Sequence, residues 1–204
     1  MSRSTAAAFS LLEMIVVIAI VGIIAAMAIP VAGSVSRATK LTQASQTIGD
    51  QLAIARQTAI ATNRAVEVRF YQYADPEVPG SKVAFRAIQA LEIVNPRLIT
   101  AVDKLQALPD SMIIDSAPVL SSILDPAKRT VSAGTDSLPR VGTNYKYVAM
   151  RFRPDGSSDL LPTAGTWFLT VHDEIQGDGL TQPPPNFATI EIDPVNGALK
   201  FFRP

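Results

Sequence analysis

One run of the sequence, residues 14–29, contains only apolar residues and glycine, and no later stretch of similar length lacks polar side chains. As a helix, residues 9–32 would rise about 36 Å at about 1.5 Å per residue, which is enough to cross a hydrocarbon layer of about 30 Å. The run therefore predicts one membrane-spanning helix. The charges that flank it, Arg3 before it and Arg37 and Lys40 after it, favour neither orientation.

Glu13 lies at the edge of this apolar run. A carboxylate carried into an apolar span is costly, and such residues usually face a group of opposite charge. Glu13 therefore predicts a cationic partner.

The residues around Glu13 read AFSLLE at positions 8–13, and with the apolar run they resemble the class III leader of type IV prepilins and type II secretion pseudopilins. The resemblance implies that a prepilin peptidase removes residues 1–8 on the cytoplasmic side, cutting between Ala8 and Phe9, and that Phe9 is then N-methylated. It also implies that Glu13 pairs with the N-terminal amine of a neighbouring subunit, and that Gly22 and Pro30 loosen the assembly helix. The expected location is the cytoplasmic (inner) membrane, crossed once, with the head outside the cytoplasm.

A secretory signal peptide is the alternative interpretation of the same segment. Ala8 stands where the prepilin family usually has glycine, and Ala26-Met27-Ala28 has the small-x-small pattern that signal peptidase cuts. A signal peptide explains neither Glu13 nor the helical pattern that follows.

Beyond Pro30 the apolar positions recur every three or four residues as far as Ala59, with polar side chains between them. This spacing predicts an amphipathic helix over residues 33–64 that packs one face against a head. Leu41, Ile48 and Leu52 are expected in that contact. The helix should end near Asn63, because asparagine tolerates the left-handed conformation of a helix cap.

From residue 65 the period of the pattern changes to two, which predicts strands. The alternating runs lie at residues 66–71, 82–94, 111–114, 145–153, 166–172, 187–193 and 198–203. Turn sequences such as Pro154-Asp155-Gly156 separate them and favour antiparallel hairpins. The fold class is therefore α+β, with a long helix packed by its second half on a mostly antiparallel β head, residues 65–204. Residues 115–143 and 173–186 are expected to be long surface loops.

Motifs in the second half of the helix and in the predicted head restrict the resemblance to particular groups of pilin-like proteins. QLAIARQTAI at residues 51–60, FRPDGS at residues 152–157 and Asn196-Gly197 in the last hairpin resemble the H-type minor pseudopilins and FimT-like minor pilins, and more narrowly the prepilin-like Verru_Chthon cassette protein D family. The resemblance implies two β-sheets around the helix, in a subunit of low abundance at or near a filament tip.

Nothing in the sequence indicates catalysis. It has one histidine, no cysteine, and no G-x-S-x-G, H-E-x-x-H or P-loop motif. His172 ends a predicted strand and is expected to be a solvated edge residue rather than a general base or a metal ligand. We therefore expect no enzyme activity and no cofactor.

Charge is balanced overall but uneven along the chain. With 18 basic and 18 acidic side chains, nucleic acid is not an expected partner. Residues 155–199 hold seven acidic side chains and no Lys or Arg. Three of them, Asp173, Glu174 and Asp178, are candidates for calcium ligands. Their spacing does not fit an EF-hand, and solvated loop charge is the simpler interpretation.

One run of the sequence holds basic residues and no acidic ones. It contains Arg140, Lys146, Arg151 and Arg153, which are available to meet an acidic patch on a neighbouring protein.

Two classes of function fit this sequence. The first is a pilus or pseudopilus structural subunit, whose partners are the membrane, the prepilin peptidase and other pilin or pseudopilin subunits. The second is a membrane-anchored or secreted β-rich binding module that does not polymerise. Phe9 together with Glu13 favours the first class.

Overall fold

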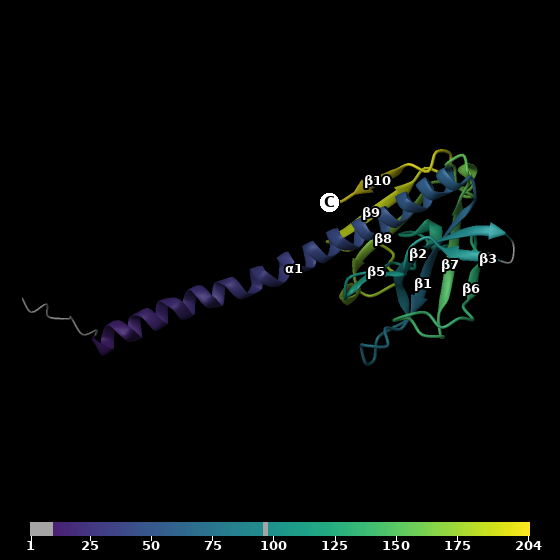
Figure 1. Ribbon diagram of the computed structural model, residues 1–204. Coiled ribbons are helices and arrows are strands. Elements are labelled where there is room, and N and C mark those ends of the chain that lie inside the picture. Colours follow the sequence, from purple (N-terminus) through teal and green to yellow (C-terminus); the bar gives the residue numbers. More distant parts are fainter. Residues whose placement is uncertain (1–9, 96–97) are drawn as a thin grey trace, which may run out of the picture. The chain divides into compact units, whose positions relative to one another are not determined.

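The computed structural model describes residues 10–95 and 98–204, with their side chains except those of residues 25–35. The chain divides into two compact units, Met1–Ala38 and Thr39–Pro204. Helix α1 (Leu11–Thr62) contributes residues to both units, and all the strands belong to the second (Figure 1).

Helix α1 ends as the sequence predicts. Asn63, the first residue after Thr62, has a φ of 52°, and the N–H of Arg64 donates to the carbonyl oxygen of Ala59 at 3.3 Å. The left-handed residue turns the chain away from the helix axis, so that strand β1 begins at Val66.

Within residues 39–95 and 98–204, ten strands form one sheet in the order β10-β9-β8-β5-β2-β1-β7-β6, with β3 and β4 paired beside β2. All of the strand pairs are antiparallel. The strands are β1 (Val66–Tyr73), β2 (Ala84–Asn95), β3 (Leu98–Ala101), β4 (Gln106–Ala107), β5 (Met112–Ile114), β6 (Val131–Ala133), β7 (Lys146–Phe152), β8 (Trp167–Asp173), β9 (Phe187–Ile192) and β10 (Leu199–Phe202). The α+β class and the antiparallel head are confirmed.

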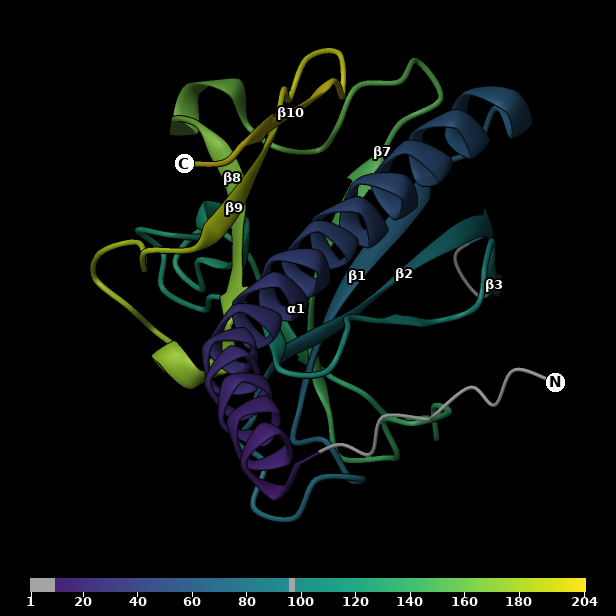
Figure 2. The same cartoon turned by 90° about the vertical axis from the view of Figure 1, so that its left-hand side faces the viewer.

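The implied division of the head into two sheets is wrong. Strand β5 pairs with β8 through three residues, and its last residue, Ile114, also pairs with Phe85 of β2. This pair joins the strands β8–β10 to the strands β1, β2 and β7. Figure 2 shows these two groups of strands on opposite sides of the second half of α1, so one bent sheet takes the place of two.

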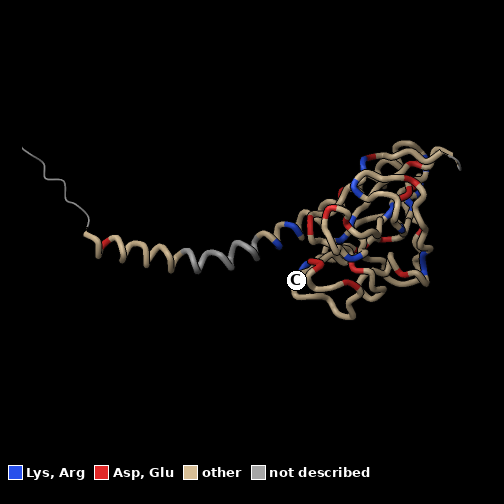
Figure 3. Tube along the Cα trace, turned by 90° about the horizontal axis from the view of Figure 1, so that it is seen from below, with Lys and Arg blue, Asp and Glu red and all other residues tan. Residues whose placement is uncertain are grey.

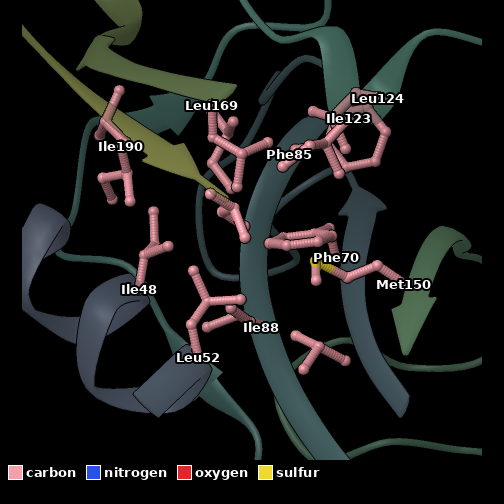
Figure 4. Packing of buried hydrophobic residues seen from close by; sticks show 14 of the residues in the cluster. Ile48, Leu52, Phe70, Phe85, Ile88, Ile123, Leu124, Met150, Leu169 and Ile190 are labelled. Atoms are coloured by element: carbon pink, nitrogen blue, oxygen red, sulfur yellow. The ribbon is translucent and has the colours of Figure 1, made fainter. Parts of the chain in front are cut away.

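The second half of α1 supplies one side of the core. Leu41, Ile48 and Leu52 are at most 1% exposed, as predicted. They belong to one hydrophobic cluster with residues from both groups of strands, including Phe70, Ile88 and Ile190 (Figure 4). Fully burying one such side chain is worth about 1.5–3 kcal/mol, so this stripe holds the helix on the sheet.

Arg56 adds a polar tie between α1 and two turns of the head. Its Nε donates to the carbonyl oxygens of Gly156 at 3.2 Å and Asn196 at 2.8 Å. The turns approach each other so closely that a Cβ on Gly197 would lie 2.5 Å from the carbonyl oxygen of Gly156. Glycine at position 197, where φ is +67°, is therefore required by both space and backbone conformation.

The prediction of a surface loop over residues 115–143 is wrong for its first part. Asp115 is fully buried, and the 3-10 helix η1 (Ser122–Leu124) is buried throughout. The reason is hydrogen bonding to strand β8: the N–H of Thr170 donates to Ser121 Oγ at 3.1 Å, and that of Phe168 donates to Ser122 Oγ at 2.9 Å. The second predicted loop, residues 173–186, contains the 3-10 helix η3 (Glu174–Gln176) and is mostly exposed.

Candidate functional site

The start of α1 is fixed by a serine cap. The N–H of Glu13 donates to Ser10 Oγ at 3.2 Å, and the N–H of Met14 donates to the Ser10 carbonyl oxygen at 3.2 Å. A serine is favoured here because its hydroxyl satisfies an N–H group that the first helical turn leaves unpaired. Glu13 lies in this first turn, where its charge also interacts favourably with the helix dipole. The Ser-x-x-Glu spacing of residues 10–13 is the sequence signal of such a cap.

The helical surface that follows is apolar and open on all sides. Every side chain of residues 11–24 is exposed, and the large apolar ones range from 47% exposed at Val17 to 79% at Leu11. Apart from Glu13, residues 11–24 are apolar all round the helix, and such a surface requires an apolar environment, either lipid or other helices. Residues 11–24 are therefore the candidate contact surface of the first unit.

Several predicted site residues remain untested. Ala8 and Phe9, the expected cleavage pair, lie outside the described residues, as does the side chain of Pro30. Gly22 is in α1, and an added Cβ there would meet nothing within 4 Å. Among the described residues, no helix has both the length and the hydropathy needed to cross a membrane. The cleavage, membrane-spanning and helix-loosening roles stay predictions.

The three calcium candidates do not share one site. Asp173 Oδ1 accepts from the N–H of Ile175 at 3.0 Å and so caps η3, whereas Glu174 forms an ion pair with Arg86. Asp178 Oδ1 accepts from the N–H groups of Ser116 and Gly179, both at 2.8 Å. Over the described part of the chain, no group of three or more acidic, histidine or cysteine side chains is placed to hold a metal ion.

The prediction of a solvated His172 is wrong, because its side chain is fully buried. Nε2 of His172 lies 2.9 Å from Oδ2 of Asp115, which is also fully buried, and Nδ1 lies 3.0 Å from the carbonyl oxygen of Asp173. Asp115 accepts two further bonds, from the N–H of Ala117 at 2.7 Å and of Leu180 at 3.2 Å. The pair thus joins β8 to the segments after β5 and after η3, which is a structural role.

The acid-free run does not form one open basic surface. Arg151 pairs with Glu67 at 2.8 Å, Arg140 pairs with Glu77 at 3.5 Å, and Arg153 donates to the carbonyl oxygen of Ser158 at 2.8 Å. Lys146 is exposed at the start of β7. Figure 3 shows basic and acidic residues interleaved through the head rather than collected on separate sides.

Glu67 is a buried carboxylate that was not predicted. Its side chain is 5% exposed and lies between two guanidinium groups, with Arg69 Nε at 2.6 Å from Oε1 and Arg151 Nη2 at 2.8 Å from Oε2. Arg69 also stacks over the ring of Tyr147 at 4.4 Å from its centre. In the sequence these residues look like the solvated alternate positions of a strand, but the guanidinium groups of Arg69 and Arg151 lie against the Glu67 carboxylate.

Comparison with known proteins bears on the N-terminal segment alone. A family model described as the prokaryotic N-terminal methylation motif matches residues 3–29. The match indicates a type IV pilin-like precursor and, in general, processing by prepilin peptidase and assembly with other pilin subunits. No curated protein and no solved structure matches the chain. The narrower H-type, FimT-like and Verru_Chthon assignments concern the head and stay predictions.

Proposed function

We propose that this protein is a minor pilin-like or pseudopilin-like structural subunit of a type IV pilus or a type II secretion pseudopilus. The observation that carries the proposal is the match of residues 3–29 to the prokaryotic N-terminal methylation motif. The open apolar surface of residues 11–24 supports it, because that surface requires lipid before assembly and neighbouring helices after it.

The proposed mechanism is association without catalysis. The helix holds the precursor in the cytoplasmic membrane with the head outside, and the peptidase cuts between Ala8 and Phe9. The new amine of Phe9, once methylated, pairs with Glu13 of the next subunit in the assembly. Because an unpaired carboxylate in an apolar surrounding is costly, this pairing would favour one stagger between adjacent helices.

The N-terminus of the mature protein tests the proposal directly. Intact-mass analysis of the protein from membranes is expected to give a chain that begins with a methylated Phe9. A chain that begins at Ile29, just after Ala26-Met27-Ala28, would contradict the proposal and favour the secreted binding module.

Two substitutions separate the effect of the Glu13 charge on assembly from the effect of the Ser10 cap on the start of the helix. Glu13→Ala removes the carboxylate but keeps the N–H that donates to Ser10, so the helix start should persist while incorporation into filaments is lost. Ser10→Ala removes the cap and keeps the charge, which should weaken the first turn by about 1 kcal/mol and preserve incorporation. Normal incorporation of the Glu13→Ala protein would refute the proposed pairing.

A further inference from the structure

A groove of about 330 Å³ opens on the face of β1 and β7 that points away from the helix-covered core. On β7, Val148, Met150 and Phe152 are fully buried in the core, so the alternate residues Tyr147, Ala149 and Arg151 face the other way. The small side chain of Ala149 lies between two large ones along the strand and leaves a hollow there. Residues of the segment 128–132 and Asp159 line the rest of the groove.

The acidic groups of this groove are already satisfied. Glu67 is held between Arg69 and Arg151, as described above. Both carboxylate oxygens of Asp159 accept from Arg129 Nη2, at 3.0 and 2.9 Å, and Oδ1 also accepts from the N–H of Arg151 at 2.9 Å. The hydrogen-bond acceptors on the groove wall are therefore occupied.

Basic side chains outnumber acidic ones at this groove, so its net charge is positive, although many of their N–H groups already have partners. Lys128 Nζ donates to the carbonyl oxygen of Ala164 at 3.3 Å, and Arg129 Nε donates to that of Ala149 at 3.2 Å. Three basic side chains line it, those of Lys128, Arg129 and Arg151, against the two acidic ones, and Arg69 adds a fourth positive charge from beside it. The side chain of Arg151 is 54% exposed even in its ion pair. Three hydroxyl groups on the wall make no hydrogen bond with any described residue, namely those of Thr130, Ser132 and Tyr147.

We propose that this groove binds an oxyanion, phosphate or sulfate, either free or carried on a small polar molecule of about saccharide size. An oxyanion supplies the several acceptor oxygens that the hydroxyls and the guanidinium of Arg151 lack, and charged hydrogen bonds of this kind are the strong ones. The volume lies at the lower end of the range of small-molecule sites, about 300–1,000 Å³. This site lies wholly in the head and does not depend on the proposed assembly function.

The test is calorimetric titration of the full-length protein, in micelles of a non-ionic detergent, with inorganic phosphate, inorganic sulfate, glucose 6-phosphate and glucose. Arg151→Gln is expected to weaken phosphate binding at least about tenfold. Arg64→Gln is the matched control, because Arg64 is 50% exposed and also pairs with a glutamate, Glu92 at 3.1 Å. It should change phosphate affinity less than about twofold, since screening leaves little effect of a distant surface charge.

Two further variants keep the test independent of the Glu67 ion pair. Thr130→Ala with Ser132→Ala removes hydroxyls that bind no described residue, so the fold should persist while phosphate affinity falls about threefold to tenfold. Ala149→Leu should fill the hollow and abolish binding.

The sugar ligands identify where the oxyanion comes from. Equal affinity for glucose 6-phosphate and phosphate indicates a free ion, whereas tighter binding of the sugar phosphate indicates a carried one. The proposal is overturned by three results: no heat of binding with either inorganic ion, equal losses in Arg151→Gln and Arg64→Gln, or glucose binding as tightly as its phosphate.

Discussion

His172 and Asp115 are both shut off from solvent, so water cannot replace either partner if the other is removed. Breaking a buried ion pair or charged hydrogen bond typically costs about 3–5 kcal/mol, because the remaining group is left unsatisfied. We expect His172→Ala to lower the free energy of unfolding by about that amount. Urea denaturation followed by the fluorescence of Trp167, which is 2% exposed, measures the change.

Lys200→Ala is the control for that measurement. Lys200 lies 3.7 Å from Glu191 and its side chain is 66% exposed, so losing this ion pair should cost less than about 1 kcal/mol. Similar losses from His172→Ala and Lys200→Ala would mean that the buried pair contributes no more than a surface one.

The hydroxyl group of Tyr71 makes the stability of the head depend on pH in the alkaline range. Burial raises the pKa of its hydroxyl to about 12, although the nearby Arg69 acts in the opposite direction, and the hydroxyl donates to Gln89 Oε1 at 3.0 Å. A raised pKa means that the folded state holds the proton more tightly than the unfolded chain, in which the pKa is about 10. This contribution to stability is therefore complete below about pH 10 and is lost as the pH rises toward about 12.

The pH dependence is checked by comparing the original protein with Tyr71→Phe. Urea denaturation at about pH 8 and about pH 11 should show a smaller loss of stability in the variant, because it has no proton to lose at this position. The two losses would be equal if the hydroxyl of Tyr71 ionised as freely in the folded state as in the unfolded chain.

Individual buried polar residues were the hardest part of the site to predict. Asp115 and His172 are 57 residues apart, and their pairing depends on how β5 and β8 align, which no local pattern reveals. Glu67 occupies a strand position that is typical of a solvent-facing residue, and its ion pair with Arg151 joins residues that are 84 positions apart in the sequence. In contrast, Glu13 and its neighbours were found because their spacing is local and specific.

At the scale of elements, the buried stripe of α1 provides a direct comparison of two neighbouring positions. Leu52 is fully buried, whereas Ile54 on the same helix is 37% exposed. Leu52→Asp would place an unpaired charge in the core and should cost at least about 3 kcal/mol of a total of about 5–15 kcal/mol. Ile54→Asp introduces the same group where water can reach it and should cost less than about 1 kcal/mol.

Thermal unfolding of the two full-length variants in detergent micelles measures the difference. A cooperative transition in Leu52→Asp at the temperature of the original protein would show that the stripe is not part of the core, and would leave contact between subunits as its role.

Strands that lie in an alternating run were predictable, including the short strands β5 and β10, and strands outside such runs were not. The seven alternating runs all became strands, because period-two alternation over several residues is a local signal. Strands β3, β4 and β6 have two to four residues each and lie outside all of these runs. The two groups of strands join into one sheet through the pair Phe85↔Ile114, a contact between residues far apart in the sequence.

At the scale of the whole molecule, the two compact units predict different solution behaviour. A shortened chain that starts at Thr39 keeps Leu41, Ile48 and Leu52 together with every strand, and it lacks the open apolar surface of residues 11–24. It should be monomeric without detergent, whereas the full-length protein should self-associate when detergent is removed. Analytical ultracentrifugation of both proteins tests this, and self-association of the shortened chain would place a second contact surface on the head.

The tie made by Arg56 bears on the order in which the head forms during synthesis. Its two acceptors, Gly156 and Asn196, lie 100 and 140 residues later in the chain. The helix therefore leaves the ribosome long before the two turns to which Arg56 donates its hydrogen bonds. Strands β9 and β10 cannot cover the buried face of the helix until the last residues emerge. Contacts over such separations form slowly and leave apolar surface exposed in the meantime. The core of a newly made head should thus stay partly exposed until the final hairpin, β9 and β10, has been synthesised. A chain that stalls before Phe187 would be a target for chaperones or proteases.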